Sequence, residues 1–124
     1  MQDENLFMYS DEIDTGIRAK RNDYLLAVTK NAICWHQHIN ANNSDSRSPL
    51  SGFLMGRNEI YLAKKHFGII VIFLTIVTRF KTAIRLIIAA TIKQRSENVK
   101  LFNRYYLKGA FAGSFGINKL PKNI

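Results

Sequence analysis

Hydrophobic and polar positions follow a helical spacing near the N-terminus of the chain. Ile13 and Ile17 stand four residues apart, and so do Asp14 and Arg18. Four-residue spacing puts each pair on one face of a helix, where a carboxylate and a guanidinium can form an ion pair. The pattern therefore predicts a short helix over residues 11–21.

The spacing then changes to short apolar runs. The stretch DYLLAVTKNAICW, residues 23–35, holds two runs rich in Val, Ile, Leu and aromatic residues, separated by Lys30 and Asn31. Such runs are typical of β-strands. Two short strands and one kinked strand both fit this pattern.

A polar loop divides the chain. Residues 38–49 are dense in Asn, Ser and Asp and end in Pro49, which is typical of a loop. We place the boundary between two parts of the chain here, at residues 1–48 and 49–124.

Long helical patterns follow the loop. The spacing predicts helices at 50–66, 69–95 and 97–108. In the second of these, Arg79 interrupts the apolar run after about a dozen residues, whereas a membrane-spanning helix needs about 20. Its polar residues align into one stripe on a helical wheel: Thr75, Thr78, Thr82 and Arg85. We interpret this segment first as an interfacial or re-entrant membrane helix, second as a packed core helix and third as a transmembrane span.

Composition and charge narrow the class of protein. With 124 residues and 47% hydrophobic content, the chain can bury one small core and is too apolar for a disordered tail. Residues 1–50 carry five basic and seven acidic side chains, a net charge of −2. Residues 51–124 carry thirteen basic and two acidic side chains, a net charge of +11. A basic second part favours an anionic membrane surface or nucleic acid as partner. Its cations are interleaved with aliphatic runs and no nucleic-acid motif occurs, so nucleic acid ranks last.

The compartment follows from two absences in the sequence. Cys34 is the only cysteine, which excludes an intramolecular disulfide and a cysteine-based metal site and fits a reducing compartment. The N-terminus has no basic region leading into an apolar stretch, so we expect no signal peptide.

Two groups of side chains could carry chemistry. Asp11, Glu12 and Asp14 follow an apolar and aromatic run. They either form a first helical turn after the N-cap Ser10, where the dipole favours each carboxylate by roughly 0.3–1 kcal/mol, or include a catalytic carboxylate. His36 and His38 follow the end of the predicted strand. A histidine at such a position is either a surface residue or a ligand for metal or phosphate.

Taken as one string, residues 6–36 resemble the C-terminal half of the catalytic domain in family 2 glycosyltransferases of the GT-A fold. The matching features are an aromatic strand end at 7–9, the pair Asp11 and Glu12, Asp14, Arg18, a turn at Asp23 and Tyr24, and an Ala-x-x-x-His at 32–36. Asp23 stands where the family has Gly. Beyond the loop, SPLSGFLMGRNEIYLAKKHF and YYLKGAFAGSFGINK resemble the Arg-Asn segment and the glycine-bearing C-terminus of bacterial rhamnosyltransferase-like members.

This resemblance implies an α+β fold. Residues 1–48 would be the C-terminal portion of a GT-A α/β domain, with one or two short strands and a helix, and residues 49–124 a mostly helical, amphipathic extension. The implied activity is inverting transfer of a sugar from a nucleotide-sugar donor to a lipid-linked or polysaccharide acceptor. It would serve cell-surface polysaccharide synthesis, peripheral to the cytoplasmic face of the plasma membrane.

The resemblance also implies roles for individual residues. Glu12 would be the base that takes the proton of the acceptor hydroxyl, with Asp11 as the alternative base. His36 would lie near the nucleotide diphosphate and either ligate a divalent metal, Mg or Mn, or contact phosphate, and Arg18 would help bind the donor.

No Asp-x-Asp motif occurs in the chain. The nucleotide-binding half of such an enzyme would lie upstream of Met1, so we expect a fragment that lacks most of the donor site. The alternative is a non-enzymatic, basic membrane-surface protein, or an inactive remnant of a transferase gene, whose acidic cluster only caps a helix.

Overall fold

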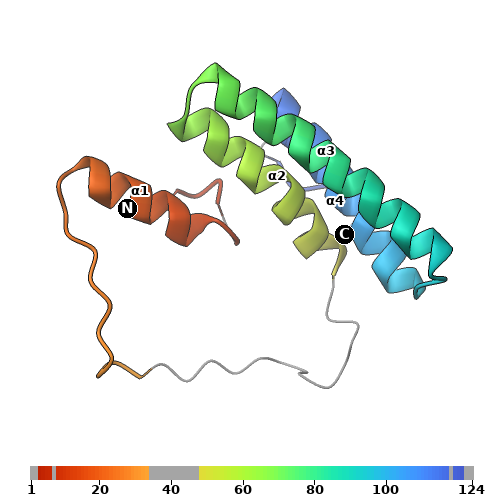
Figure 1. Ribbon diagram of the computed structural model, residues 1–124, viewed down its shortest axis with the longest axis horizontal. Coiled ribbons are helices and arrows are strands. Elements are labelled where there is room, and N and C mark those ends of the chain that lie inside the picture. The colour runs from red at the N-terminus through yellow and green to blue at the C-terminus, as the bar shows by residue number, and fades with distance from the viewer. Residues whose placement is uncertain (1–2, 7, 34–47, 118, 122–124) are drawn as a thin grey trace.

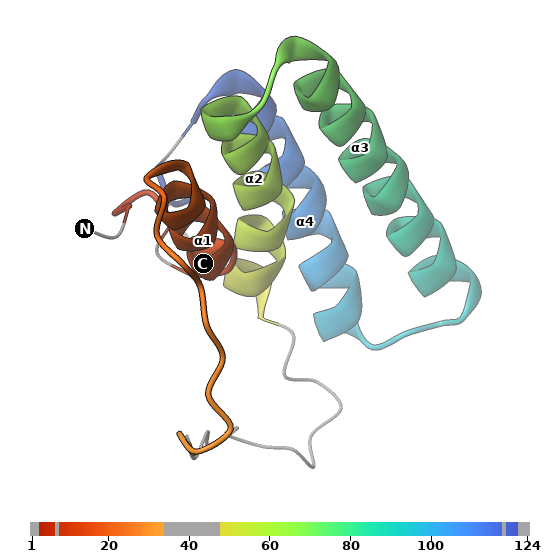
Figure 2. The ribbon, with the colours of Figure 1, turned by 60° about the vertical axis from the view of Figure 1, so that its left-hand side comes forward.

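The computed structural model describes residues 3–6, 8–33, 48–117 and 119–121. Within these ranges the chain forms helices α1 (Asp11–Arg21), α2 (Pro49–His66), α3 (Ile69–Ile92) and α4 (Glu97–Phe115), and no strand. Figures 1 and 2 show α2, α3 and α4 side by side as a bundle, with α1 against α2 on the side away from α3. The expected α+β fold is therefore wrong for the described residues, which are helical.

The predicted strand segment explains this error. Residues 24–33 run as irregular, exposed chain after α1, and the side chains of Leu25, Val28 and Ile33 are 97%, 102% and 78% exposed. A strand is stabilised by hydrogen bonds to a neighbouring strand, and no described segment offers any. Side chains that favour strands are thus not sufficient to form one here. The end of the predicted strand, residues 34–35, lies outside the described residues.

The predicted helices in both parts of the chain are confirmed, and their ends have local causes. α1 spans the predicted residues, and α2 begins at Pro49, one residue before its predicted start. Ser48 caps it, because the Ser48 hydroxyl oxygen accepts the N–H of Ser51 at 3.1 Å, and proline is well suited to the first helical turn. α3 ends at Ile92, before its predicted end at residue 95, and Gln94 beyond it has a φ of 45°.

α4 continues past its predicted end at residue 108 through two glycines, Gly109 and Gly113. A Cβ atom on Gly109 would lie 2.0 Å from the carbonyl oxygen of Phe53, and one on Gly56 would lie 2.2 Å from that of Tyr106. α2 and α4 therefore pack backbone against backbone. This close packing offsets the roughly 1 kcal/mol that each helical glycine loses relative to alanine.

Apolar and ionic contacts complete the bundle. Ala83 of α3 packs in a buried cluster with Phe102 and Tyr106 of α4. Arg79 of α3 reaches across to Glu59 of α2 with both terminal nitrogens, each at 2.8 Å from a carboxylate oxygen. These contacts attach α3 to the α2–α4 pair along one side only. None of the described helices has the length and hydropathy needed to cross a membrane.

Candidate functional site

The acidic cluster lies in the first turn of α1, as the sequence predicts. Ser10 occupies the N-cap position, but the expected side-chain cap is wrong: Ser10 is left-handed, with φ 67° and ψ 3°, and its hydroxyl makes no cap hydrogen bond. Its carbonyl instead accepts the backbone N–H of Asp14 at 3.0 Å. The carboxylates still sit at the positive end of the helix dipole, where negative charge is favoured.

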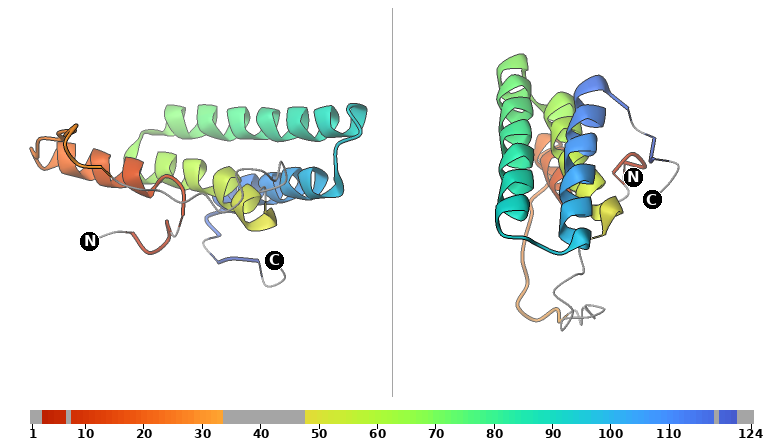
Figure 3. Two further views of the ribbon diagram at one scale, coloured as in Figure 1. Left: turned by 90° about the horizontal axis from the view of Figure 1, so that it is seen from below. Right: turned by 90° about the vertical axis from the view of Figure 1, so that its right-hand side faces the viewer.

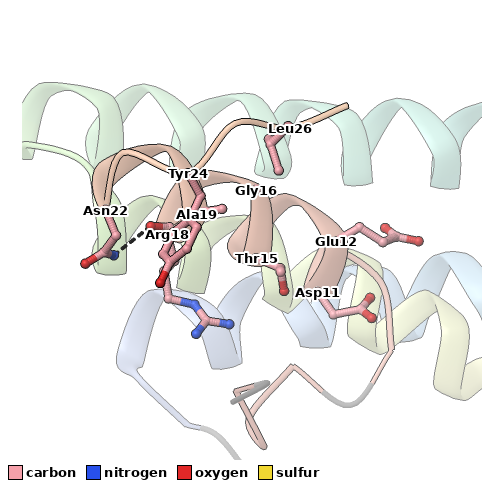
Figure 4. Close-up of a pocket in the computed structure, with 9 residues that line it drawn as sticks. All are labelled: Asp11, Glu12, Thr15, Gly16, Arg18, Ala19, Asn22, Tyr24 and Leu26. Carbon is pink, nitrogen blue, oxygen red and sulfur yellow. Dashed lines mark hydrogen bonds between the residues drawn. The ribbon is translucent and has the colours of Figure 1, made fainter. Parts of the chain in front are cut away.

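Asp11 and Glu12 line an open groove beside α1, and both side chains extend outward from the N-terminal end of the helix (Figure 4). Glu12 is exposed and Asp11 is half-buried. The groove has a volume of about 770 Å³ and is lined by Asp11, Glu12, Thr15, Gly16, Arg18, Ala19, Asn22, Tyr24 and Leu26. Three of the predicted site residues, Glu12, Asp11 and Arg18, thus line the same groove, although the Arg18 guanidinium pairs with Asp14.

Asp14 has a different environment, although it is only two residues from Glu12. Its side chain is 1% exposed and accepts from Arg18 at 2.9 Å, from Lys65 at 2.8 Å and from His66 at 2.6 Å. Burial raises the pKa of Asp14, but the hydrogen bonds from Lys65, His66 and Arg18 outweigh burial and hold the pKa below its usual value. Asp14 is therefore a structural carboxylate that joins α1 to the C-terminal end of α2.

His66 is fully engaged in the same network. Arg21 donates to Nδ1 of His66 at 3.1 Å and also to its carbonyl oxygen. Because a guanidinium can only donate, Nδ1 is the acceptor and Nε2 carries the proton that His66 donates to Asp14. Both ring nitrogens are occupied, so His66 does not offer a free base. Sequence reasoning missed this residue, and the available signal was a basic last turn of α2 in a chain whose α1 begins with an acidic turn.

The N-terminal segment is held by the same face of α2. Lys65 and the Tyr61 hydroxyl both donate to Asp3, at 2.5 Å and 2.9 Å. Burial raises the pKa of Asp3, whereas the hydrogen bonds from Lys65, Asn5 and Tyr61 lower it more, so that it lies well below its usual value.

The Arg-Asn segment supports the residues that lead into the acidic pair. Asn58 is fully buried, and its Nδ2 donates to the carbonyls of Met8 at 2.6 Å and Tyr9 at 2.9 Å. Arg57 is 2% exposed, donates to the carbonyl of Asn5 and also binds the Asn58 side-chain oxygen at 2.9 Å. Two stretches about 50 residues apart therefore form one unit that fixes the start of α1.

The predicted metal ligand, His36, lies outside the described residues, as does the neighbouring histidine at position 38. No group of three His, Cys, Asp or Glu side chains gathers within the described ranges in a way that could hold a metal. Asp14 cannot join Asp11 and Glu12 as a third ligand, since both of its oxygens accept from cationic or imidazole groups. The described residues alone do not fit a metal ion.

Comparison of the chain with protein-family models, with curated proteins and with solved structures finds no match.

Proposed function

We propose that this chain is the acceptor-side part of a family 2 type glycosyltransferase, with Glu12 as the general base and Asp11 beside it. The hydrogen bonds from Asn58 to the carbonyls of Met8 and Tyr9 carry this proposal. The resemblance singles out two distant stretches, the acidic pair and the Arg-Asn segment. The contact between these two stretches supports the proposal, because Asn58 holds the backbone just before the acidic pair.

The environment of each carboxylate supports the division of roles. A base must be reachable by the acceptor hydroxyl, and Glu12 is exposed at an open groove. Asp14 is buried among hydrogen-bond donors. In the proposed step the acceptor oxygen attacks the anomeric carbon, the bond from that carbon to the nucleotide diphosphate breaks, and Glu12 takes the hydroxyl proton.

The donor side belongs to a nucleotide-binding domain, carried by another chain or by another part of a longer one. That domain would supply the Asp-x-Asp motif, a divalent metal (Mg or Mn) and the nucleotide-sugar site, with Arg18 and His36 near the diphosphate. The exposed apolar side chains of residues 24–33 are the surface that such a domain would cover.

Substitution of the carboxylates in an enzyme rebuilt with a nucleotide-binding domain tests the proposal. Glu12→Gln keeps the shape and removes the proton acceptor, so kcat should fall by roughly 10²–10⁴, whereas loss of the dipole interaction should lower stability by only about 0.3–1 kcal/mol. Glu4→Gln is the matched control, because Glu4 is also exposed but does not line the groove, and it should leave transfer intact.

Asp11→Asn tests the alternative assignment of the base. Should Asp11→Asn abolish transfer while Glu12→Gln does not, Asp11 is the base. Full activity in both variants would contradict the catalytic role of the pair and leave it as the dipole-favoured first turn of α1.

A further inference from the structure

The outward side of α3 carries an apolar face that Lys81 interrupts between Val77 and Ile84. Its members recur at intervals of one, three, four and seven residues, so they lie on one side of the helix. They are between 46% and 75% exposed: Ile70, Phe73, Leu74, Val77, Ile84, Ile88 and Ile92. Figure 3 shows α3 in a layer of its own, with α2 and α4 on its opposite side. We call this set of seven side chains the α3 outer face.

The threonines of α3 add to its apolar character. All four hydroxyls donate to the carbonyl four residues earlier in the same helix, at 2.7–3.0 Å: Thr75, Thr78, Thr82 and Thr91. A hydroxyl that already donates within its helix needs less water. The expected polar stripe is therefore less polar than its residue types suggest.

Cations accompany the α3 outer face and no acidic residue does. Lys81 and Arg85 are exposed on the same side of the helix, and residues 69–96 contain no Asp or Glu. Near the end of α3 a shallow groove of about 320 Å³ is formed by Ile88, Ala89 and Ile92 together with Arg85 and Lys93. An apolar depression between two cations is complementary to an anionic phospholipid. The acyl chain can contact the apolar side chains, and the phosphate can contact the cations.

We propose that the α3 outer face binds an anionic phospholipid membrane, with the helix lying parallel to the membrane surface. The apolar side chains enter the boundary between headgroups and acyl chains, and the long side chains of Lys81 and Arg85 extend to the phosphates. This inference is independent of the proposed sugar transfer. Charge disfavours a second copy as occupant, because a symmetric α3–α3 contact would bring these cations against each other with no acidic residue on the helix to pair with them.

Cosedimentation of the full chain with vesicles tests the proposal. We expect binding to phosphatidylcholine vesicles that contain about a quarter phosphatidylglycerol, and little binding to phosphatidylcholine alone. High salt should release part of the protein, since charge attraction is screened within a Debye length of about 8 Å at physiological ionic strength. Equal binding to both vesicles would contradict the role of the cations.

A double substitution locates the contact. Ile84→Ser with Ile88→Ser should weaken vesicle binding roughly tenfold or more. The matched control is Ile13→Ser with Ile33→Ser, which replaces two isoleucines of similar or greater exposure outside α3 and should bind as the wild type does. Equal effects of the two double variants would overturn the assignment to α3.

Two further measurements keep the outcome decisive. Circular dichroism checks that the variants keep their helices, and Lys81→Glu with Lys93→Glu tests the same face without removing apolar side chains. This charge reversal should abolish the preference for phosphatidylglycerol.

Sedimentation without lipid tests whether a second copy of the chain occupies the face instead. A dimer that Ile84→Ser dissociates, combined with no vesicle binding, would show that the α3 outer face is a protein interface.

Discussion

Glu12 and Asp14 show how environment separates two carboxylates in one helical turn. Glu12 is exposed at the edge of an open groove, whereas Asp14 faces the C-terminal end of α2 and accepts from Lys65 and His66. The helix spacing determines this difference, because positions two apart lie on different sides of a helix. Any substitution in the acidic cluster should therefore affect either the groove or the fold, according to the residue changed.

Asp14→Asn should lower stability at neutral pH by about 3 kcal/mol, because the donors from Lys65 and His66 lose a buried charge partner. The lowered pKa of Asp14 sets the pH dependence. Its contribution is complete above the unfolded pKa of about 3.9 and is lost as the pH falls through the lower folded pKa. Thermal unfolding should be measured from neutral pH down to about pH 2. The difference in stability between wild type and Asp14→Asn should become smaller below about pH 4.

Asp23→Asn is the control for this prediction. Asp23 is exposed and left-handed, with a φ of 59°, a conformation that asparagine tolerates. We expect its melting temperature to follow that of the wild type at every pH. A constant difference between wild type and Asp14→Asn over the whole pH range would show that Asp14 does not act through its charge.

At the level of the elements, the α2–α4 pair depends on glycines that have no conformational role in a helix. Gly52 and Gly56 on α2 and Gly109 and Gly113 on α4 allow the two backbones to approach closely. A helical glycine is normally unfavourable, so its effect here depends on the neighbouring helix.

Gly109→Ala should destabilise the protein by roughly 2 kcal/mol or more, because its Cβ would lie 2.0 Å from the backbone oxygen of Phe53. Gly16→Ala in α1 is the same substitution without a clash, since the nearest atom to its Cβ would be Leu26 Cδ1 at 3.7 Å. It should stabilise α1 by about 0.5–1 kcal/mol through helix propensity. Urea unfolding of both variants measures these effects. Equal changes in the free energy of unfolding would contradict the packing argument.

At the level of the whole molecule, α1 and the bundle are held by different forces. Side-chain hydrogen bonds and ion pairs, together with the buried side chain of Leu6, hold residues 3–21, whereas α2 and α4 share close backbone packing. Contacts that depend on a few polar side chains can open without unfolding the rest. We therefore expect α1 to open at lower free energy than the bundle.

Asn58→Ala should enlarge the difference in opening free energy between α1 and the bundle. The carbonyls of Met8 and Tyr9 would lose their donor, and hydrogen exchange of the α1 amides should accelerate roughly tenfold or more while α2 and α4 keep their protection. Asn31→Ala, at an exposed asparagine, should leave the exchange unchanged. Uniform acceleration in all four helices would mean that α1 unfolds only together with the bundle.

The sequence by itself determined where the helices lie. Hydrogen bonds of a helix join residues four apart, and its caps involve near neighbours such as Ser48 and Ser51, so local spacing is sufficient to locate it. The acidic first turn of α1 is predictable for the same reason.

Only the tertiary structure decided the features that need a distant partner. The apolar run at 24–33 is not a strand, since the described residues supply no neighbouring strand, and α4 continues through Gly109 because α2 lies against it. Burial of Asp14 rather than Glu12, and the use of His66 to hold it, depend on α2, which is about 50 residues away. Contacts of this kind depend on which surfaces the folded chain brings together. The local spacing of residues therefore does not predict them.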